Sequence, residues 1–316
     1  MAKILALRLV RLIATMLAVS FLTFIMVAFL PGDPVNAVLP ITEERTPEIE
    51  AAVRAELNLD KPVITRYVMW LGDVLQGDLG KSFVTDQPVA ETIKDRLPVT
   101  AQLAVMSIGL ALLLAIPIGV LGAYKQGKAP DQISSAGVQV ALAVPNFVLA
   151  VFLIRFFSID IPIFPAGSWN RISDGIGPNL RNAFLPTCAL ALSQMAVFSR
   201  LLRSDMVNTL REDFVTSARA KGLSDRYILF RHALRPSSLS LVTIAGINIG
   251  ALLGGTVIVE QIFSLPGLGR RLIAAIGVGD IMVIQGITVF IAFAYVVINT
   301  AVDLFYMVVD PRIRRG

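Results

Sequence analysis

The sequence predicts an all-α membrane protein with six transmembrane helices. Of its 316 residues, 55% are hydrophobic and only 16% are charged, whereas a soluble globular chain is about a quarter charged. Such an apolar excess cannot be buried in one water-soluble core. The apolar runs are also continuous and long enough to cross a hydrocarbon layer of about 30 Å, whereas the strands of a membrane β-barrel alternate apolar and polar residues.

Six apolar stretches approach the roughly 20 residues that a spanning helix needs. The first follows Lys3, Arg8 and Arg11, as the apolar region of a signal peptide would. This run is too long for a typical signal peptide, and no small-x-small cleavage site follows it, so we interpret it as an uncleaved first span. The predicted spans are residues 12–30, 103–123, 133–157, 185–202, 241–258 and 282–306.

The distribution of Lys and Arg predicts the orientation. With the N-terminus inside, the inner segments carry 16 of these residues and the outer segments 11. Seven of the outer ones lie in residues 32–98, and long translocated segments are largely exempt from the positive-inside rule. Both termini are therefore expected in the cytoplasm. Residues 32–98 are expected to form an extracytoplasmic lobe, in which residues 46–59 have an amphipathic helical pattern.

The residue types disfavour several kinds of site and partner. Basic residues lie beside apolar segments and not in one patch with aromatics, so nucleic acid is not expected as a partner. The single cysteine, Cys188, excludes an internal disulfide, and the single histidine, His232, disfavours a histidine-based metal site. Gly80-Lys81-Ser82 resembles the end of a phosphate-binding P-loop, but Leu75 stands where its first glycine is required. We expect no cofactor in this chain.

Two other classes of membrane protein were weighed against these features. A secondary transporter usually carries internal repeats and buried ionisable residues, but no repeat is evident and Asp303 is the one well-immersed acid. An intramembrane enzyme needs a nucleophile and a base within hydrogen-bond reach. Cys188 and His232 are predicted on opposite sides of the membrane, which disfavours that class.

Polar residues within the predicted spans are candidates for a solute path. Asn146, Gln194 and Asn248 lie near the middles of their spans, and Pro145-Asn146 is expected to interrupt and kink the third one. The alternative is that these amides bond between helices and hold the bundle together, and the sequence leaves both readings open. Glycines at about four-residue spacing in the fifth span predict close helix packing: Gly246, Gly250, Gly254 and Gly255.

The inner segment 199–238 is predicted to carry a basic helix–turn–helix. A first helix, residues 213–221, would end at Gly222, as glycine ends helices at the C′ position. Ser224 would cap a second helix that runs to about Leu234. Such a piece lies on anionic lipid or docks on a protein, and physical chemistry alone slightly favours lipid.

The same segment carries a family resemblance. It reads Asp213-Phe214-Val215-Thr216-Ser217-Ala218-Arg219-Ala220-Lys221-Gly222-Leu223-Ser224, then Arg231-His232-Ala233-Leu234-Arg235, and resembles the EAA-type loop of ABC importer permeases, nearest the peptide branch. Further matches to the B-type permease of dipeptide and oligopeptide importers fall at residues 31–34, 70–82, 96–100, 260–269, 299–306 and 310–312. Three departures are Thr216-Ser217-Ala218 in place of Glu-Ala-Ala, Phe214 in place of a common tyrosine, and Arg235 at a proline position.

The resemblance implies a type I ABC importer permease fold in a bacterial cytoplasmic (inner) membrane. One permease domain, residues 1–316, would include the lobe 32–98 and the coupling loop 199–238. It would translocate dipeptides or oligopeptides by alternating access, without catalysing a reaction; nickel, glutathione or sugars remain open as cargo. The implied ATPase-coupling residues are Asp213, Thr216, Ser217, Ala218, Arg219, Lys221, Gly222, Leu223 and Ser224.

The resemblance also implies the partners. These are a second homologous permease, two cytoplasmic ATPase subunits or domains that bind ATP and Mg, and an extracytoplasmic solute-binding protein. Asn146, Gln194 and Asn248 would then line half of the translocation path.

Overall fold

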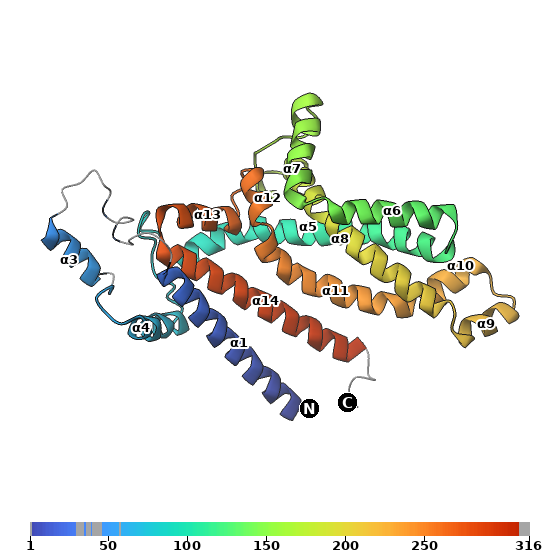
Figure 1. Cartoon of the computed structure of the whole chain (residues 1–316), viewed down its shortest axis with the longest axis horizontal. Helices are drawn as coiled ribbons and strands as arrows, with labels where there is room; N and C mark the ends of the chain where they lie inside the picture. Colours follow the sequence, from blue (N-terminus) through green and yellow to red (C-terminus); the bar gives the residue numbers. More distant parts are fainter. Residues whose placement is uncertain (1, 30–34, 36–38, 40–45, 57, 310–316) are drawn as a thin grey trace. The chain divides into compact units, whose positions relative to one another are not determined.

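A computed structural model describes residues 2–29, 35, 39, 46–56 and 58–309, which form helices joined by short connections (Figure 1). Among these residues, β pairing is limited to an isolated antiparallel bridge between Lys81 and Pro88. The elements in chain order are α1 (Ala2–Ala28), α3 (Pro47–Glu56), α4 (Val63–Leu75), α5 (Val89–Tyr124), α6 (Ala129–Ala143), α7 (Asn146–Ile154), the π-helix η1 (Arg155–Asp160), the 3-10 helix η2 (Ile172–Asp174), α8 (Ile176–Thr209), α9 (Asp213–Ala220), α10 (Asp225–Tyr227), the π-helix η3 (Ile228–Ala233), α11 (Leu234–Gly255), α12 (Val257–Ile262), α13 (Leu268–Val278) and α14 (Ile281–Val309).

The predicted all-α membrane architecture is confirmed. Four helices are long and apolar enough to cross a bilayer: α5, α8, the continuous helix Asp225–Gly255, and α14. The bent pair α6 and α7 together qualifies as a fifth span, and in α1 the apolar helix Leu12–Val27 is shorter. Each of the six predicted apolar stretches is therefore helical for most of its length.

The third predicted span, residues 133–157, is not one kinked helix. α6 and α7 differ in direction by 94°, and Figure 1 shows α7 turning away from α6. Val144 and Pro145 both have extended backbone, with ψ of 117° and 140°. The proline ring disfavours helical backbone at the residue before it. The predicted interruption at Pro145-Asn146 is present, and it is more than a kink, because two consecutive extended residues break the helix completely.

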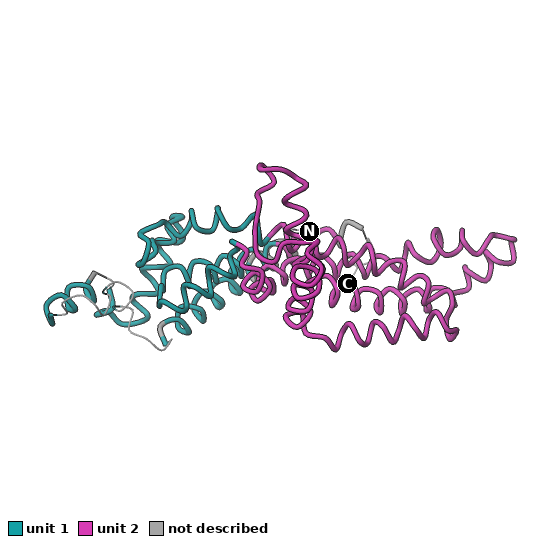
Figure 2. The backbone as a smooth tube through the Cα atoms, turned by 90° about the horizontal axis from the view of Figure 1, so that it is seen from above, with its two compact units in different colours: residues 1–100, 266–297 teal, residues 101–265, 298–316 magenta. Residues whose placement is uncertain are grey.

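The chain divides into two compact units (Figure 2). Unit 1 comprises residues 1–100 and 266–297, and unit 2 comprises residues 101–265 and 298–316. The single permease domain of residues 1–316 stays a prediction about how these units act together.

In unit 1 the described part of the predicted lobe is folded against α1. Phe24, Tyr67, Trp70 and Val289 form a buried cluster. The Tyr67 hydroxyl lies 2.9 Å from Ser20 Oγ, and the Tyr67 ring meets the Phe24 ring edge-on at 5.5 Å between centroids. Edge-to-face aromatic pairs stabilise by about 0.5–1.5 kcal/mol beyond their buried area, so this cluster fixes α4 on the first helix.

The amphipathic helix predicted at residues 46–59 corresponds to α3. Thr46 Oγ1 accepts the Ile49 amide proton at 3.3 Å, which caps the first turn. On the expected apolar face, Val53 is buried while Ile49 and Ala52 are exposed, and Leu57 lies outside the described residues. The motif matches at residues 31–34 and 310–312 lie outside them as well.

A buried carboxylate holds the turn that contains Gly80-Lys81-Ser82. Asp280 has no exposed surface; it accepts the Ser82 hydroxyl proton at 2.6 Å and the Phe83 amide proton at 3.2 Å. Arg271 Nη2 lies 3.4 Å from Asp280 Oδ2. The contacts of Ser82 and Phe83 with Asp280 join residues nearly 200 positions apart, so the turn is a structural anchor between α4 and α5.

Unit 2 is built around α8, which packs against α6, α7 and α11. Leu190, Phe198 and Leu202 of α8 are fully buried. A Cβ placed at Gly246 would lie 2.5 Å from Val302 Cγ2. The predicted close helix approach at Gly246 is therefore present, between α11 and the last part of α14.

Candidate functional site

The helix α9 lies on unit 2 with one apolar face turned inward. Val215 and Ala218, three residues apart, are buried against Ile228 of η3, and Leu210 packs on the same cluster. Burying a valine or isoleucine side chain contributes about 1.5–3 kcal/mol. The rest of α9 is thereby left to solvent, and Phe214 is 47% exposed. Of the implied coupling residues, Ala218 alone lies on the buried face and acts as an anchor for the others.

The turn after α9 has the predicted form. Gly222 has a φ of +77°, a left-handed conformation in which a Cβ is penalised. Ser224 Oγ accepts the Tyr227 amide proton at 3.4 Å, as expected of an N-cap residue. The Tyr124 hydroxyl at the end of α5 donates to Asp225 Oδ2 at 3.2 Å. This bond ties the start of α10 to the end of a spanning helix.

The second predicted helix does not end near Leu234. α10, η3 and α11 follow one another without a break, so that Asp225–Gly255 is one helix of 31 residues. On the other side, α8 continues to Thr209, where the Thr209 and Ser237 hydroxyls lie 3.1 Å apart. The segment 199–238 therefore contains the ends of two long helices, and the connection between them is residues 210–224.

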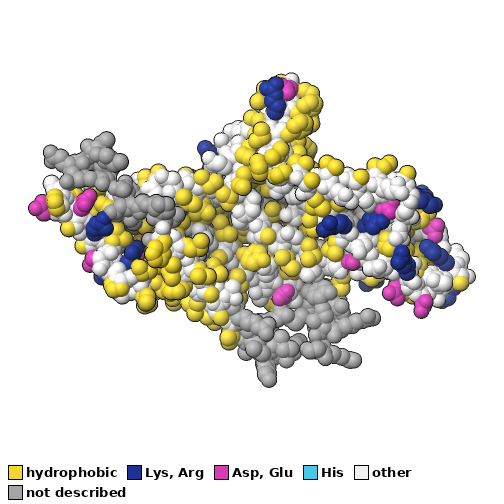
Figure 3. Space-filling model, viewed as in Figure 1, with side chains coloured by type: hydrophobic (Ala, Val, Ile, Leu, Met, Phe, Trp, Pro, Cys, Tyr) yellow, Lys and Arg dark blue, Asp and Glu magenta, His cyan; other side chains and the backbone are white. Residues whose placement is uncertain are grey.

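The surface of this connection is polar with scattered exposed aromatic and aliphatic groups. Figure 3 shows Lys and Arg side chains, together with Asp and Glu, gathered around the end of unit 2 that carries α9 and α10. Phe214, Leu223 and Tyr227 are exposed among them. An exposed apolar side chain surrounded by charges is typical of a protein-docking surface. The implied coupling residues other than Ala218 all lie on this exposed side: Asp213, Thr216, Ser217, Arg219, Lys221, Gly222, Leu223 and Ser224.

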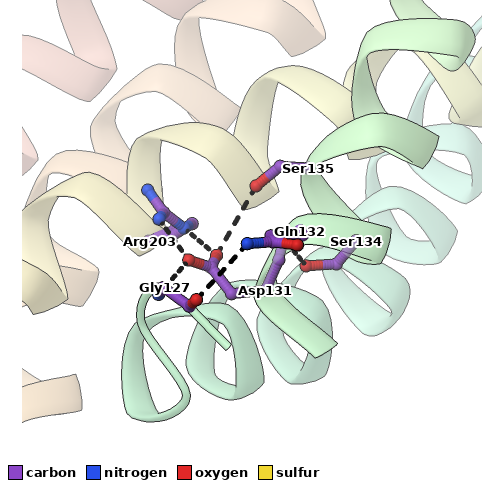
Figure 4. Close-up of polar contacts among 6 residues, drawn as sticks. All are labelled: Gly127, Asp131, Gln132, Ser134, Ser135 and Arg203. Atoms are coloured by element: carbon purple, nitrogen blue, oxygen red, sulfur yellow. Dashed lines mark hydrogen bonds and ion pairs between the residues drawn. The ribbon is translucent and has the colours of Figure 1, made fainter. Parts of the chain in front are cut away.

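An ion pair that the sequence did not predict fixes α6 on α8 beneath this connection. Arg203 Nε and Nη2 donate to the two carboxylate oxygens of Asp131, at 2.5 and 2.7 Å (Figure 4). Asp131 Oδ2 also accepts the Gly127 amide proton at 2.8 Å. A Cβ at Gly122 would lie 3.1 Å from Arg203 Cδ, so α5 approaches the pair closely. A bidentate Arg–carboxylate pair is among the stronger polar contacts and holds a definite orientation.

The three candidate path residues all lie in unit 2 and are half-buried. Asn146 is the first residue of α7, directly after the break at Pro145. Gln194 lies in the interior of α8. Asn248 Nδ2 donates to the Ile244 carbonyl of its own helix at 2.8 Å. No hydrogen bond among these three side chains is found in the described part of the chain, and the bond of Asn248 is within one helix, not between helices.

A buried amide network at the beginning of α8 went unnoticed in the sequence. Gln102 Nε2 donates to Asn179 Oδ1 at 2.5 Å, and Asn179 Nδ2 donates to the Asn170 carbonyl at 2.7 Å. Asn182 Nδ2 donates to Asn170 Oδ1 at 2.6 Å. Asn179 and Asn182 lie on one helix face, but this turn falls before the predicted span. Because its groups are paired with one another, the network is a structural anchor.

Comparison with known proteins identifies the family. A family model for the inner membrane component of binding-protein-dependent transport systems matches residues 115–315. The model for the N-terminal part of the same membrane component matches residues 1–104. The chain belongs to this family. It is the permease of an ABC transport system and not an enzyme, and the family implies ATPase and solute-binding partners at an inner membrane.

Individual relatives extend over nearly the whole permease. A peptide transport system permease protein of Brucella abortus (strain 2308) is 38% identical over 307 residues, 97% of each chain. The glutathione transport system permease protein GsiC of Salmonella choleraesuis (strain SC-B67) is 34% identical over 310 residues, again 97% of each. A structure of the inward-facing MetNI methionine ABC transporter has a TM-score of 0.53 at 17% identity, covering 70% of this permease and 97% of that chain. The type I importer permease fold is thereby confirmed.

Proposed function

We propose that this permease carries dipeptides or oligopeptides into the cytoplasm by alternating access. A peptide permease and a glutathione permease are both similar to it over 97% of its length, and glutathione is itself a short peptide. These names support a peptide-like cargo over a metal ion or a sugar. The permease would have one state open to the outside and one open to the cytoplasm, and binding of solute and of ATP would shift the equilibrium between these two states.

The coupling of ATP hydrolysis to transport is assigned to residues 210–224. One observation carries this proposal. The exposed residues of the connection 210–224 lead directly into one continuous helix, Asp225–Gly255. A partner that moves α9 also moves Ile228, because Val215 and Ala218 pack on it. Ile228 belongs to that helix, so displacement of the loop becomes displacement of a span. ATP and Mg would be bound by two cytoplasmic ATPase subunits or domains that dock here.

A turn variant tests this coupling. Gly222→Asp, assayed in the full transporter with its ATPases and binding protein, should abolish ATP-dependent uptake of a labelled peptide while membrane insertion is retained. Its left-handed backbone disfavours any side chain by about 1–2 kcal/mol, and the new carboxylate adds charge to the docking surface.

A second glycine provides the matched control. Gly127 has a similar φ of +76° in the turn between α5 and α6, with nothing within 4 Å of an added Cβ, as at Gly222. Gly127→Ala and Gly222→Ala should therefore show similar small losses of stability. If Gly222→Asp transports at the wild-type rate with its ATPases still attached, residues 210–224 are not the coupling element.

The other half of the path is assigned to a second, homologous permease. Asn146, Gln194 and Asn248 would face a wet cavity between the two permeases. An unpartnered amide that faces lipid costs several kcal/mol, and the Asn248 bond to Ile244 leaves its amide oxygen able to accept from water or solute. A cysteine at each position should react with a small water-soluble thiol reagent in one nucleotide state and be protected by saturating peptide. Three unreactive cysteines would contradict this assignment.

Both termini and residues 210–224 are assigned to the cytoplasm, and residues 32–98 to the outside, on the distribution of Lys and Arg. A cysteine at Thr216, in a Cys188→Ser background, should not react with an impermeant reagent added to intact cells. Labelling from outside would reverse the orientation.

The outer lobe is assigned to contact with the solute-binding protein. Most connections in compact domains are shorter than about a dozen residues, and the lobe carries two helices, one of them packed on α1. Deletion of residues 46–60 should weaken association of the binding protein and lower uptake. Normal association would mean that the lobe only covers the permease pair.

A further inference from the structure

A polar pocket lies in unit 2 between α5, α6 and α8, beside the Asp131–Arg203 ion pair. Its volume is about 230 Å³. Ser134, Ser135 and Gln139 line it from α6, and Arg200 and Arg203 line it from α8. Figure 4 shows Arg203 and the two serines around Asp131. Ile118 and Val138 supply apolar walls.

The pocket carries an unbalanced positive charge. Both Asp131 oxygens are engaged by Arg203, and one also accepts the Gly127 amide proton, so this pair is neutral. Arg200 is exposed and has no ion-pair partner in the part of the chain that the structure describes. The serine hydroxyls of the pocket already donate within the chain, Ser134 to the Asp131 carbonyl, Ser135 to Asp131 Oδ1 and Ser199 to the Ala196 carbonyl. The remaining donor that lines the pocket is the Gln139 amide. The pocket therefore suits an anion.

The position along the helices places the pocket at a membrane boundary. Arg200 and Arg203 lie at the inner end of the predicted span 185–202, and Ser134 and Ser135 lie at the start of the predicted span 133–157. Beside them on α6, Ile133 and Val140 are 71% and 64% exposed. Large apolar side chains next to a cationic pocket at this depth match a lipid, with acyl chains beside α6 and the headgroup at the arginines.

We propose that this pocket binds the phosphate of an anionic phospholipid of the cytoplasmic leaflet. Arginine recognises phosphate through two parallel N–H donors, and basic pockets between membrane helices on the cytoplasmic side suit anionic headgroups. Arg200 supplies the charge, while the Gln139 amide donates to another phosphate oxygen. A bound headgroup bridges α6 and α8 next to the ion pair that already joins them. The choice of leaflet rests on the orientation proposed above.

The chemistry of the pocket favours this ligand over the transported peptide. A peptide at neutral pH carries an ammonium as well as a carboxylate, and its ammonium needs an acceptor. The one carboxylate beside the pocket, Asp131, already accepts from Arg203 and Gly127. A phosphodiester carries negative charge without a cation when its headgroup is glycerol.

Native mass spectrometry of the purified full transporter tests the proposal. The complex is released from micelles that hold equal amounts of phosphatidylglycerol and phosphatidylethanolamine. The wild type should retain phosphatidylglycerol selectively, and Arg200→Gln should lower the retained amount about fivefold, as loss of one surface arginine contact implies. Arg200→Lys should retain an intermediate amount. The control is Arg155→Gln, since Arg155 is also an exposed arginine of unit 2 but pairs with Asp160 at the end of η1.

Three results would overturn the proposal. Wild-type retention of phosphatidylglycerol by Arg200→Gln would show that the arginine holds no headgroup. Equal retention of phosphatidylethanolamine would mean that charge is not recognised. Displacement of phosphatidylglycerol by saturating peptide would place the pocket on the solute path. Binding in micelles does not depend on membrane orientation, so a reversed topology would change the assigned leaflet but not the amount of lipid retained. A failure of the transport proposal would likewise leave the amount of retained lipid unchanged.

Discussion

The turn of unit 1 at residues 80–88 and the connection of unit 2 at residues 210–224 are held in opposite ways. The turn is fastened by a fully buried carboxylate, Asp280, through Ser82, Phe83 and Arg271. The connection is fastened by a small apolar cluster around Val215, and nearly all its polar side chains are exposed. A segment held by buried ion pairs and hydrogen bonds has few polar groups left for a partner. A segment held by apolar contacts keeps its charged side chains exposed, where a partner can bind them.

This difference predicts unequal costs for comparable substitutions. Removing one member of a buried ion pair leaves a charge without compensation and costs about 3–5 kcal/mol. Removing apolar atoms from a small cluster costs only the transfer energy of those atoms and the cavity they leave.

The largest effect is expected at the turn of residues 80–88. Asp280→Ala leaves Arg271, whose side chain is 14% exposed, without its carboxylate partner. The permease should lose about 3–5 kcal/mol of stability, measured as a fall in the midpoint of thermal unfolding of the purified complex. The control is Asp73→Ala, an exposed aspartate on α4 of the same unit, which should change the free energy of unfolding by less than about 0.5 kcal/mol. Equal thermal midpoints for Asp280→Ala and Asp73→Ala would contradict the claim that the buried ion pair holds the turn of residues 80–88.

An intermediate effect is expected at the connection of residues 210–224. Val215→Ala removes two methyl groups from the cluster that holds α9, at a cost of about 2 kcal/mol. Amide hydrogen exchange in α9 should become about thirtyfold faster, because the local opening becomes more populated. Exchange in α8 should not change. Val140→Ala is the matched control, since Val140 is exposed on α6. If exchange accelerates equally along α8 and α9, the loop is not an independent unit of opening.

The smallest effect concerns the hydroxyl that ties the lobe to α1. Tyr67→Phe keeps the aromatic cluster but removes the contacts of the hydroxyl with Ser20 Oγ at 2.9 Å and the Leu17 carbonyl at 3.3 Å. One neutral hydrogen bond contributes about 1 kcal/mol, so the thermal midpoint should fall slightly. Tyr295→Phe, at a half-exposed tyrosine of the same unit, should leave it unchanged. A loss at Tyr67 as large as that at Asp280 would show that the hydroxyl is part of a larger network.

Local signals in the sequence predicted local structure well. The turn at Gly222 and the cap at Ser224 follow from the conformations that these residue types favour, and both are present. The apolar runs predicted the long helices because a helix that crosses lipid must be apolar over most of its length. The close approach at Gly246 was predicted from spacing alone, although its partner Val302 was not.

Prolines show where such signals fail. Pro186 lies inside α8 without ending it, whereas Pro145 separates α6 from α7 by a 94° bend. Residue type is the same in both places, and the outcome depends on the backbone of the preceding residue and on the helices packed around it. A single sequence shows neither.

The contacts that hold the site in place are also beyond a single sequence. Asp131 and Arg203 are 72 positions apart, and Ser82 and Asp280 are 198 apart. Each residue alone looks like an ordinary polar residue near the end of a helix. Each pair forms only because the fold brings distant segments of the chain together. For the same reason the pocket between α6 and α8 could not be predicted from the sequence.

The π-helix η3 sets the angle between α9 and the faces of α11. In an α-helix each residue advances by about 100° around the axis, and a π-helical turn holds more residues than an α-helical one. Residues 228–233 therefore fix the angle between Ile228, which contacts α9, and the faces of α11. If this turn closed to α geometry while keeping all its residues, the extra residue would no longer fit within the turn, and α9 would be rotated by about 100° around the axis of α11. The connection 210–224 would keep its sequence and its exposed side chains, yet it would present them at a different angle to α11.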